Sequence, residues 1–567
     1  MNNKIVICIL FTLMLYVSNA DCITPPYKPN ELLSELIKIN DVGISNSLKG
    51  QWIDKNAVFY GAIFDEDSIV SPMQTADFIQ LLMCGYISPA SEYYKSKELL
   101  NRMILAANGL IKLQHEDGTI DLLSTNYHSA PDLGFTIYPI SLVYSIMLQH
   151  GNFNFGELPL LMKRYMLKAG EALSVGGVHT PNHRWVISGA LSWLYKFFRD
   201  PKYKARAEQW LAEKVDIDPD GQYNERSTAV YTPVTNRSLI DMAQNLNFDY
   251  LYEYVRKNLD MTFYFVRSNG EIATESSNRG DKYTVSDMSG YYRFYRFMAL
   301  KDNNSRYSGM VEYIERTVPV AHLRSILPYF IEDPSMLQEL PKPAALPTSY
   351  RKHFTYSDIV RIREGERDIS IITNNSTFFC YFKGNAALEA MRLSSSFFGR
   401  GQFQSEKIEN ISDTYVLSST IKGPYYQPLQ KEKIPADGEA WGKVPRSERE
   451  QSEIQTLDTK IYITATDAKI RVKVLIQGPE NLPVSLELGF RQGGTLSNVN
   501  KKEGIDGAYL IKNGGYAEYF KDGNTIKVGP GICKHKKILL RGALPKLQAD
   551  CLYFTTFAPS EFEFTIE

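Results

Sequence analysis

Apolar residues recur at three- and four-residue spacing through the first half of the chain, from about residue 29 to residue 339. That spacing is typical of helices with one buried face. It is clearest over residues 30–37, 94–113, 156–173 and 184–198. We therefore predict a helical domain over residues 21–335.

The pattern changes at about Tyr350 to alternation of apolar and polar residues, with many β-branched side chains. Alternation of this kind predicts strands with one buried face, most clearly over residues 368–373, 460–466 and 468–476. A proline-rich segment separates the two patterns. We expect a linker over residues 336–350 and an antiparallel β-sandwich over residues 351–567.

A turn with a glycine recurs through the helical half, at Gly118, Gly177, Gly221 and Gly270, at intervals of 59, 44 and 49 residues. Each interval has room for one pair of helices and their loops. Stacked helix pairs of this length form an open solenoid or an (α/α) toroid, incomplete or closed. We predict the toroid, in which equivalent loops gather on one face and form the binding surface.

The N-terminus has the pattern of a secretory signal over residues 1–20. The apolar run from residue 5 to residue 17 is too short to span a bilayer, and residues 18 and 20 are small, as signal cleavage requires. Asp21 stands before Cys22, where a lipoprotein signal has a small residue. We expect an exported protein, periplasmic or extracellular, without a lipid anchor or a membrane span.

Composition narrows the class of partner. Lys and Arg number 63 and Asp and Glu number 64, giving a net charge of −1. Without a basic excess, nothing drives binding to nucleic acid through released counterions. The mean hydropathy of −0.27 argues against a polytopic membrane protein. None of the six cysteines has metal-ligand spacing, so free thiols are expected rather than a metal site or a disulfide scaffold.

The densest chemical motif runs from His179 through Asn182 and His183 to Trp185. Pro181 separates the two histidines and predicts a helix start, which argues against both binding one metal ion from a single helical turn. We expect Thr180 to cap that helix. Asn182 and His183 then lie in its first turn, either as donors to a substrate carboxylate or as buried structural groups.

A second motif runs from Asp220 to Tyr231, before a helix that we expect to start near Thr235. It holds Tyr223, Glu225, Arg226 and Tyr231, where Glu225 and Arg226 form either a structural ion pair or part of a site. Three further candidates for substrate binding lie elsewhere in the chain: His128, Arg237 and Arg279.

Motifs for other chemistries are absent from the sequence, which has no GxSxG elbow, no P-loop and no HExxH. The available groups are His, Tyr, Asn and Arg, without a clear nucleophile. Such groups suit abstraction of the C5 proton of a uronic acid. An Asn and a His would stabilise the extra negative charge on the carboxylate, and a Tyr would take the proton and return one to the leaving O4.

The domain order, the Asn-His pair and the later DG…ERS…Y segment together resemble the heparinase/alginate-lyase superfamily of polysaccharide lyases. The resemblance covers nearly the whole mature chain as architecture, and residues 180–231 as motif. It implies that Asn182 and His183 neutralise the uronate carboxylate and that Tyr231 is the acid and base. The interval from Glu225 to Tyr231 is longer than is typical, so Tyr223 stays an alternative.

Within the superfamily, the chain looks most like the family 27 lyases, which cleave L-rhamnose-α-1,4-D-glucuronate caps of arabinogalactan. The resemblance implies β-elimination at a 4-O-linked uronate, with a uronate-containing glycan as partner and no required cofactor; a structural divalent cation is the open alternative there. Two functions compete with this one. The first is an α/α-barrel glycoside hydrolase, which would need two carboxylates from among Asp132, Glu225, Glu275 and Asp287. The second is a non-catalytic glycan-binding surface protein.

Overall fold

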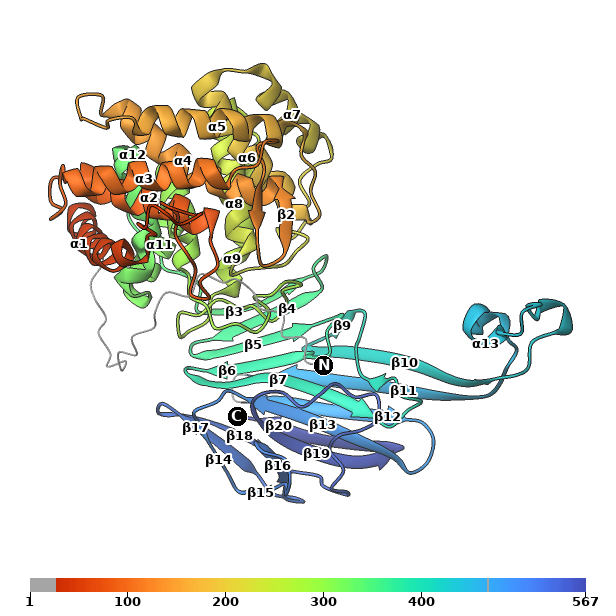
Figure 1. Cartoon of the computed structure of the whole chain (residues 1–567). Helices are drawn as coiled ribbons and strands as arrows, with labels where there is room; N and C mark the ends of the chain where they lie inside the picture. Colours follow the sequence, from red (N-terminus) through yellow and green to blue (C-terminus); the bar gives the residue numbers. More distant parts are fainter. Residues whose placement is uncertain (1–26, 467–468) are drawn as a thin grey trace. The chain divides into compact units, whose positions relative to one another are not determined.

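The computed structural model describes residues 27–466 and 469–567. The predicted signal peptide, residues 1–20, lies outside the described residues. The chain divides into two compact units (Figure 1). The helical unit ends at Pro347 and excludes residues 267–269, which group with residues 348–567 in the β unit.

The helical unit contains consecutive helices and one short β-hairpin. They are α1 (Pro29–Ser47), α2 (Pro72–Ile87), α3 (Lys97–Leu113), β1 (Ile120–Leu122), β2 (Asn126–Ser129), α4 (Ala130–Gln149), α5 (Leu158–Val175), α6 (Pro181–Phe198), α7 (Pro201–Ala212), α8 (Tyr231–Leu246), α9 (Leu251–Thr262), α10 (Tyr292–Asp302), α11 (Ser305–Thr317) and α12 (Leu327–Glu332).

Alternate helices form one layer, in which α2 contacts α4, α4 contacts α6 and α6 contacts α8. Each packs against the helix that follows it in the chain, so α3, α5, α7 and α9 form a second layer. Within the first layer the Tyr138 hydroxyl of α4 contacts the Val186 carbonyl of α6 at 3.2 Å and Ser238 Oγ of α8 at 2.8 Å. The contacts advance in the same direction along α4 and α6, from Phe135 with His183 to Tyr138 with Val186. They do so along α6 and α8 as well, from Gly189 with Ser238 to Trp193 with Asp241. The three helices therefore run parallel and begin at one end of the unit.

The recurring glycine turn has a structural cause at three of its positions. Gly118, Gly221 and Gly270 have φ of +87°, +108° and +88°. A Cβ at Gly118 would lie 2.3 Å from the Lys168 carbonyl oxygen of α5, and one at Gly221 would lie 2.5 Å from the Lys257 carbonyl oxygen of α9. The turns at Gly118 and Gly221 therefore pack against the backbone of a second-layer helix, which only glycine permits. Gly177 has neither feature, with open space around its Cβ position.

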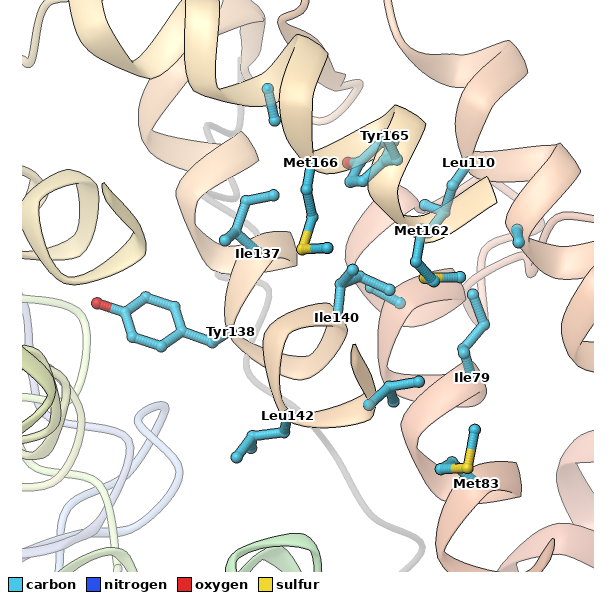
Figure 2. Close-up of a cluster of buried hydrophobic side chains, with 14 of the residues drawn as sticks. Ile79, Met83, Leu110, Ile137, Tyr138, Ile140, Leu142, Met162, Tyr165 and Met166 are labelled. Carbon is cyan, nitrogen blue, oxygen red and sulfur yellow. The ribbon is translucent and has the colours of Figure 1, made fainter. Parts of the chain in front are cut away.

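The core of the helical unit lies between the two layers. Figure 2 shows Ile79 and Met83 of α2, Leu110 of α3, Ile137 to Leu142 of α4 and Met162 to Met166 of α5 packed together. Among the described residues, α4 alone is long and apolar enough to cross a membrane, and 89% of its apolar window is buried inside the unit. Its apolar surface is therefore explained by packing in the core.

The β unit contains two sheets around one apolar core. Its strands are β3 (Ser349–Phe354), β4 (Ile359–Glu364), β5 (Arg367–Ile372), β6 (Phe379–Lys383), β7 (Ala386–Ser395), β8 (Gly401–Gln402), β9 (Ile408–Ile411), β10 (Thr414–Tyr426), β11 (Gln451–Ala465), β12 (Ile470–Gln477), β13 (Leu482–Phe490), β14 (Thr495–Ser497), β15 (Val499–Lys501), β16 (Ala508–Ile511), β17 (Ala517–Lys521), β18 (Asn524–Gly529), β19 (Asp550–Ala558) and β20 (Ser560–Ile566).

One sheet has eight strands in the order β14-β17-β18-β20-β12-β11-β10-β9. The other has ten strands, nine of them in the order β15-β16-β19-β13-β7-β6-β5-β4-β3, and the tenth, β8, pairs with β7. Among the described strands every pairing is antiparallel except β16 with β19. Alternate residues of both sheets fill the space between them, which is the packing of a β-sandwich. The long hairpin of β10 and β11 carries the short helix α13 (Ala440–Lys443) at its tip (Figure 1).

The described cysteines are free thiols, as expected. Cys84, Cys380 and Cys551 are buried, and Cys533 is half-buried.

Candidate active site

Asn182 and His183 lie in the first turn of α6, as the sequence predicts. Pro181 occupies the first helical position and Thr180 the N-cap, in an extended conformation. Thr180 is thus the N-cap residue, as predicted, but its hydroxyl makes no cap bond. The Thr180 carbonyl instead accepts the His183 N–H at 3.2 Å, and its hydroxyl accepts from Asn182 Nδ2 at 3.3 Å.

A buried carboxyl group holds the Asn182 side chain. Asn182 Nδ2 donates to both oxygens of Glu225, at 2.9 and 2.8 Å, although the two residues are 43 positions apart. Both are buried, with 1% and 8% of their surfaces exposed. Burial raises the pKa of the Glu225 carboxyl, while the bond from Asn182 and the charge of Arg279 oppose that rise.

Arg279 joins Glu225 to Tyr231. Its Nε lies 3.5 Å from Glu225 Oε1, and its guanidinium carbon lies 5.0 Å from the centre of the Tyr231 ring. Arg226, the neighbour of Glu225 in the chain, makes no ion pair within the described part of the chain. Glu225 is therefore paired with Arg279 rather than with Arg226, and Arg279 is the cation beside the tyrosine.

His183 is buried and uncharged at neutral pH. Only 7% of its surface is exposed, and burial lowers its pKa to about 4, with His179 and Arg279 adding to the effect. The His179 ring meets it edge-on at 4.7 Å between centroids. Within the described residues, His183 Nδ1 and Asn182 Oδ1 are buried without a hydrogen-bond partner. Such atoms are costly unless a ligand or water satisfies them.

Tyr231 is the first residue of α8, four positions before the start predicted at Thr235. Its N–H donates to Ser227 Oγ at 3.0 Å. Ser227 Oγ in turn donates to Asp281 Oδ1 at 2.9 Å, and the Ala229 N–H donates to Asp281 Oδ2 at 3.1 Å. Asp281 is 2% exposed, so it fixes the loop that presents Tyr231. Sequence reasoning missed Asp281, although its position two residues after Arg279 was available as a signal.

Tyr223 has a different environment. It is 3% exposed, and its hydroxyl donates to Asn236 Oδ1 at 2.9 Å. Burial raises the pKa of its phenol well above the ordinary value. This hydroxyl is committed to a bond inside the core, whereas the Tyr231 side chain is only half-buried.

Two further predicted residues lie outside this chain of contacts. His128 is exposed in β2, where its Nδ1 lies 2.7 Å from Asp117 Oδ2 and its ring stacks on that of His115 at 4.0 Å. Arg237 lies deeper along α8, with its guanidinium 3.8 Å from the Tyr138 ring centre. The structure thus brings together six of the predicted residues: His179, Asn182, His183, Glu225, Tyr231 and Arg279.

Asp132, a candidate carboxylate for the hydrolase alternative, is committed to the start of α4. Its Oδ2 accepts from Ser129 Oγ at 2.5 Å and from Asn126 Nδ2 at 2.8 Å. Among residues 27–466 and 469–567, no group of three His, Cys, Asp or Glu side chains is placed to hold a metal ion.

No known family model matches the chain, and no curated protein is similar to it. Solved structures match it in fold along nearly its whole length. Chondroitin AC lyase of Streptomyces coelicolor A3 in complex with chondroitin sulphate has a TM-score of 0.55 at 12% identity, over 97% of this chain and 80% of that one. Heparinase III has a TM-score of 0.55 at 11% identity, over 96% and 84%.

A xanthan lyase of Paenibacillus gives a TM-score of 0.59 at 10% identity, over 95% of this chain and 57% of that one. Identities this low show similarity of fold. They confirm the predicted fold class. The chain therefore has a helical toroid followed by a β-sandwich, the architecture of these polysaccharide lyases.

Proposed function

We propose that the protein is a polysaccharide lyase that cleaves a 4-O-linked uronic acid by β-elimination and leaves a 4,5-unsaturated uronate. The observation that carries the proposal is the continuous set of contacts from Asn182 through Glu225 and Arg279 to Tyr231. It places the Asn182 amide and the Arg279 guanidinium around the carboxyl group of Glu225 and ends at Tyr231. The shared fold with polysaccharide lyases supports the same reaction class.

Recognition of the uronate carboxylate falls to Asn182 and His183. The pKa of His183 near 4 makes it a neutral imidazole at pH 7, able to donate one N–H. The two Nδ2 hydrogens of Asn182 are shared between Glu225 and the Thr180 hydroxyl, so Asn182 donates to the substrate by giving up its longer bond, the one to Thr180. These donors act where negative charge grows as C5 loses its proton, and removing one donor of this kind costs about 3–4 kcal/mol of transition-state stabilisation.

Tyr231 moves the proton. Its phenolate oxygen takes the C5 proton, the C–H electron pair forms the C4=C5 double bond, and the C4–O4 bond breaks with its electrons going to O4. The same hydroxyl then gives its proton to O4, because the C5 hydrogen and the leaving oxygen of glucuronate lie on one side of the ring. The Arg279 guanidinium lies over the same ring, with its carbon 5.0 Å from the ring centre.

We further propose D-glucuronate as the sugar, capped by L-rhamnose as in arabinogalactan, and export of the mature protein to the periplasm or outside the cell. The experiment is a panel of uronate polysaccharides, including rhamnose-capped arabinogalactan, chondroitin, heparan sulfate and alginate, followed by ultraviolet absorbance. A rise in absorbance marks the conjugated unsaturated uronate. Reducing ends released without that absorbance would identify a hydrolase, and binding without either product a glycan-binding protein.

A further inference from the structure

A hollow of about 370 Å³ lies in the segment between α1 and α2, and none of the residues assigned to the reaction lines it. Trp52 and Phe64 form part of its lining, with their ring centres 4.4 Å apart and their planes tilted by 43°. Trp52 is 42% exposed. The volume is near the lower end of the roughly 300–1,000 Å³ of small-molecule pockets, which suits a single sugar ring.

Backbone bonds hold this segment in one conformation. The Trp52 N–H donates to the Ala62 carbonyl at 3.0 Å, and the Gly61 N–H donates to the Trp52 carbonyl at 2.8 Å. Asp65 Oδ1 accepts the N–H groups of Asp67 and Ile69 at 3.0 and 2.9 Å. The exposed indole is therefore presented by an ordered backbone, so binding costs little ordering of the loop.

The lining combines an aromatic face with polar groups. Lys49, Asp54 and Ser68 line the same hollow. Gln51 also lines it and is 4% exposed, and its Oε1 has no hydrogen-bond partner among the described residues. A sugar ring has an apolar C–H face and a rim of hydroxyl groups, so it matches an exposed aromatic face surrounded by donors and acceptors.

The charge of the segment selects among sugars. Residues 49–68 contain the acidic residues Asp54, Asp65, Glu66 and Asp67 and the basic residues Lys49 and Lys55. The two charged residues that line the hollow, Lys49 and Asp54, balance each other, so the hollow offers no excess positive charge to a uronate carboxylate. A neutral sugar ring is therefore favoured over a uronate at this position.

The segment that forms the hollow leads to the end of the helical unit at which the candidate active site lies. The segment leads into α2 at Ser71, and Asp77 lies in the second turn of α2. The charge of Arg237, in the second turn of α8, lowers the pKa of Asp77 against the effect of burial. The starts of α2 and α8 thus lie at one end, which is also where Asn182 and Tyr231 begin their helices.

We propose that the Trp52–Phe64 hollow is a second glycan subsite, which stacks a neutral sugar unit of the substrate away from the uronate that reacts. The ligand class rests on the proposed function. Binding is measured without turnover, by saturation-transfer NMR and calorimetry with the methyl glycosides of galactose, glucose and rhamnose, and with methyl glucuronide as the charged comparison.

We expect at least one neutral glycoside to bind and to receive saturation on its C–H face. Trp52→Ala should weaken that binding by about tenfold or more, since truncating a central aromatic contact has effects of this size. Tyr250→Ala is the matched control, because Tyr250 is 52% exposed on the helical unit and lies outside the hollow, and it should bind like the wild type. If Trp52→Ala does not fold, Trp52→Gln takes its place.

Absence of binding by every neutral glycoside, or equal binding by wild type and Trp52→Ala, would overturn the subsite. Preference for the glucuronide would overturn the selection by charge. A protein that binds neutral glycosides through Trp52 but forms no unsaturated product from any uronate polymer would refute the proposed function alone.

Discussion

The substitution Tyr231→Phe removes one oxygen atom and separates chemistry from binding. The Tyr231 backbone is held by the bond from its N–H to Ser227 Oγ, which the substitution leaves intact. The contact of Arg279 with the ring also survives, because a phenyl ring attracts a guanidinium as a phenol ring does. We therefore expect normal folding and nearly normal substrate affinity.

Turnover should fall steeply. One residue serves as both base and acid in the proposed reaction, and each proton transfer by a placed side chain contributes roughly 10²–10⁴-fold. Loss of the hydroxyl should lower kcat by about 10³-fold or more, or about 4 kcal/mol. The assay is the initial rate of ultraviolet absorbance, with KM and kcat determined separately.

Tyr223→Phe is the matched control, since it removes the same atom eight positions earlier. The Tyr223 hydroxyl is buried and bonded to Asn236. Its loss should lower the free energy of unfolding by about 1–2 kcal/mol and leave kcat within a few fold of wild type. Turnover by Tyr231→Phe within tenfold of wild type would refute the mechanism, and loss of turnover in Tyr223→Phe alone would move the role to Tyr223.

Three other predictions concern charge and backbone. In the wild type, KM should rise as pH increases through the raised pKa of Glu225, because the ionised Glu225 carboxylate then repels the substrate carboxylate. In Glu225→Gln, KM should be independent of pH. Identical pH profiles of KM in the two proteins would contradict this. His183 has its pKa lowered from 6.5 to about 4, so the unfolded chain binds more protons between those values and stability falls as pH drops. The free energy of unfolding in urea, taken as wild type minus His183→Gln, should be about 3 kcal/mol lower at pH 4 than at pH 7. The same difference between the two proteins at both pH values would contradict the lowered pKa of His183. Gly221→Ala should destabilise by about 2 kcal/mol or more, given its φ of +108° and the 2.5 Å approach to Lys257, while Gly177→Ala should stay within about 0.5 kcal/mol in the same assay.

The order of helices and strands is largely predictable because it depends on local periodicity. Apolar spacing of three and four residues marks α1, α5 and α6, and alternation marks β5, β11 and β12. The helix α8 begins four residues before the predicted start at Thr235 and has Pro233 in its first turn. Proline is tolerated in the first helical turn, where the backbone N–H has no intrahelical partner, so α8 begins at Tyr231.

The pairing within the site is harder to predict, because it depends on contacts between distant segments. The motif around Asn182 and the motif around Glu225 are each visible in the sequence, but the bond between them is set by how α6 meets the loop before α8. Local reasoning left Glu225 and Arg226 as either an ion pair or part of a site, whereas the fold pairs Glu225 with Arg279, 54 positions away. Trp52 carried no motif, and only its exposure in the folded chain distinguishes it from a core aromatic.

The most direct test of the central claim follows the oxygen atoms during cleavage. The protein is incubated with a uronate glycan that it cleaves, in water enriched in heavy oxygen, and the products are analysed by mass spectrometry. Elimination consumes no water, so we predict a product fragment lighter by one water molecule than the hydrolysis product, with no heavy oxygen incorporated at the cleaved bond. Heavy oxygen at that position, in a saturated sugar, would show hydrolysis and contradict the assignment of Tyr231, Asn182 and His183 to a lyase reaction.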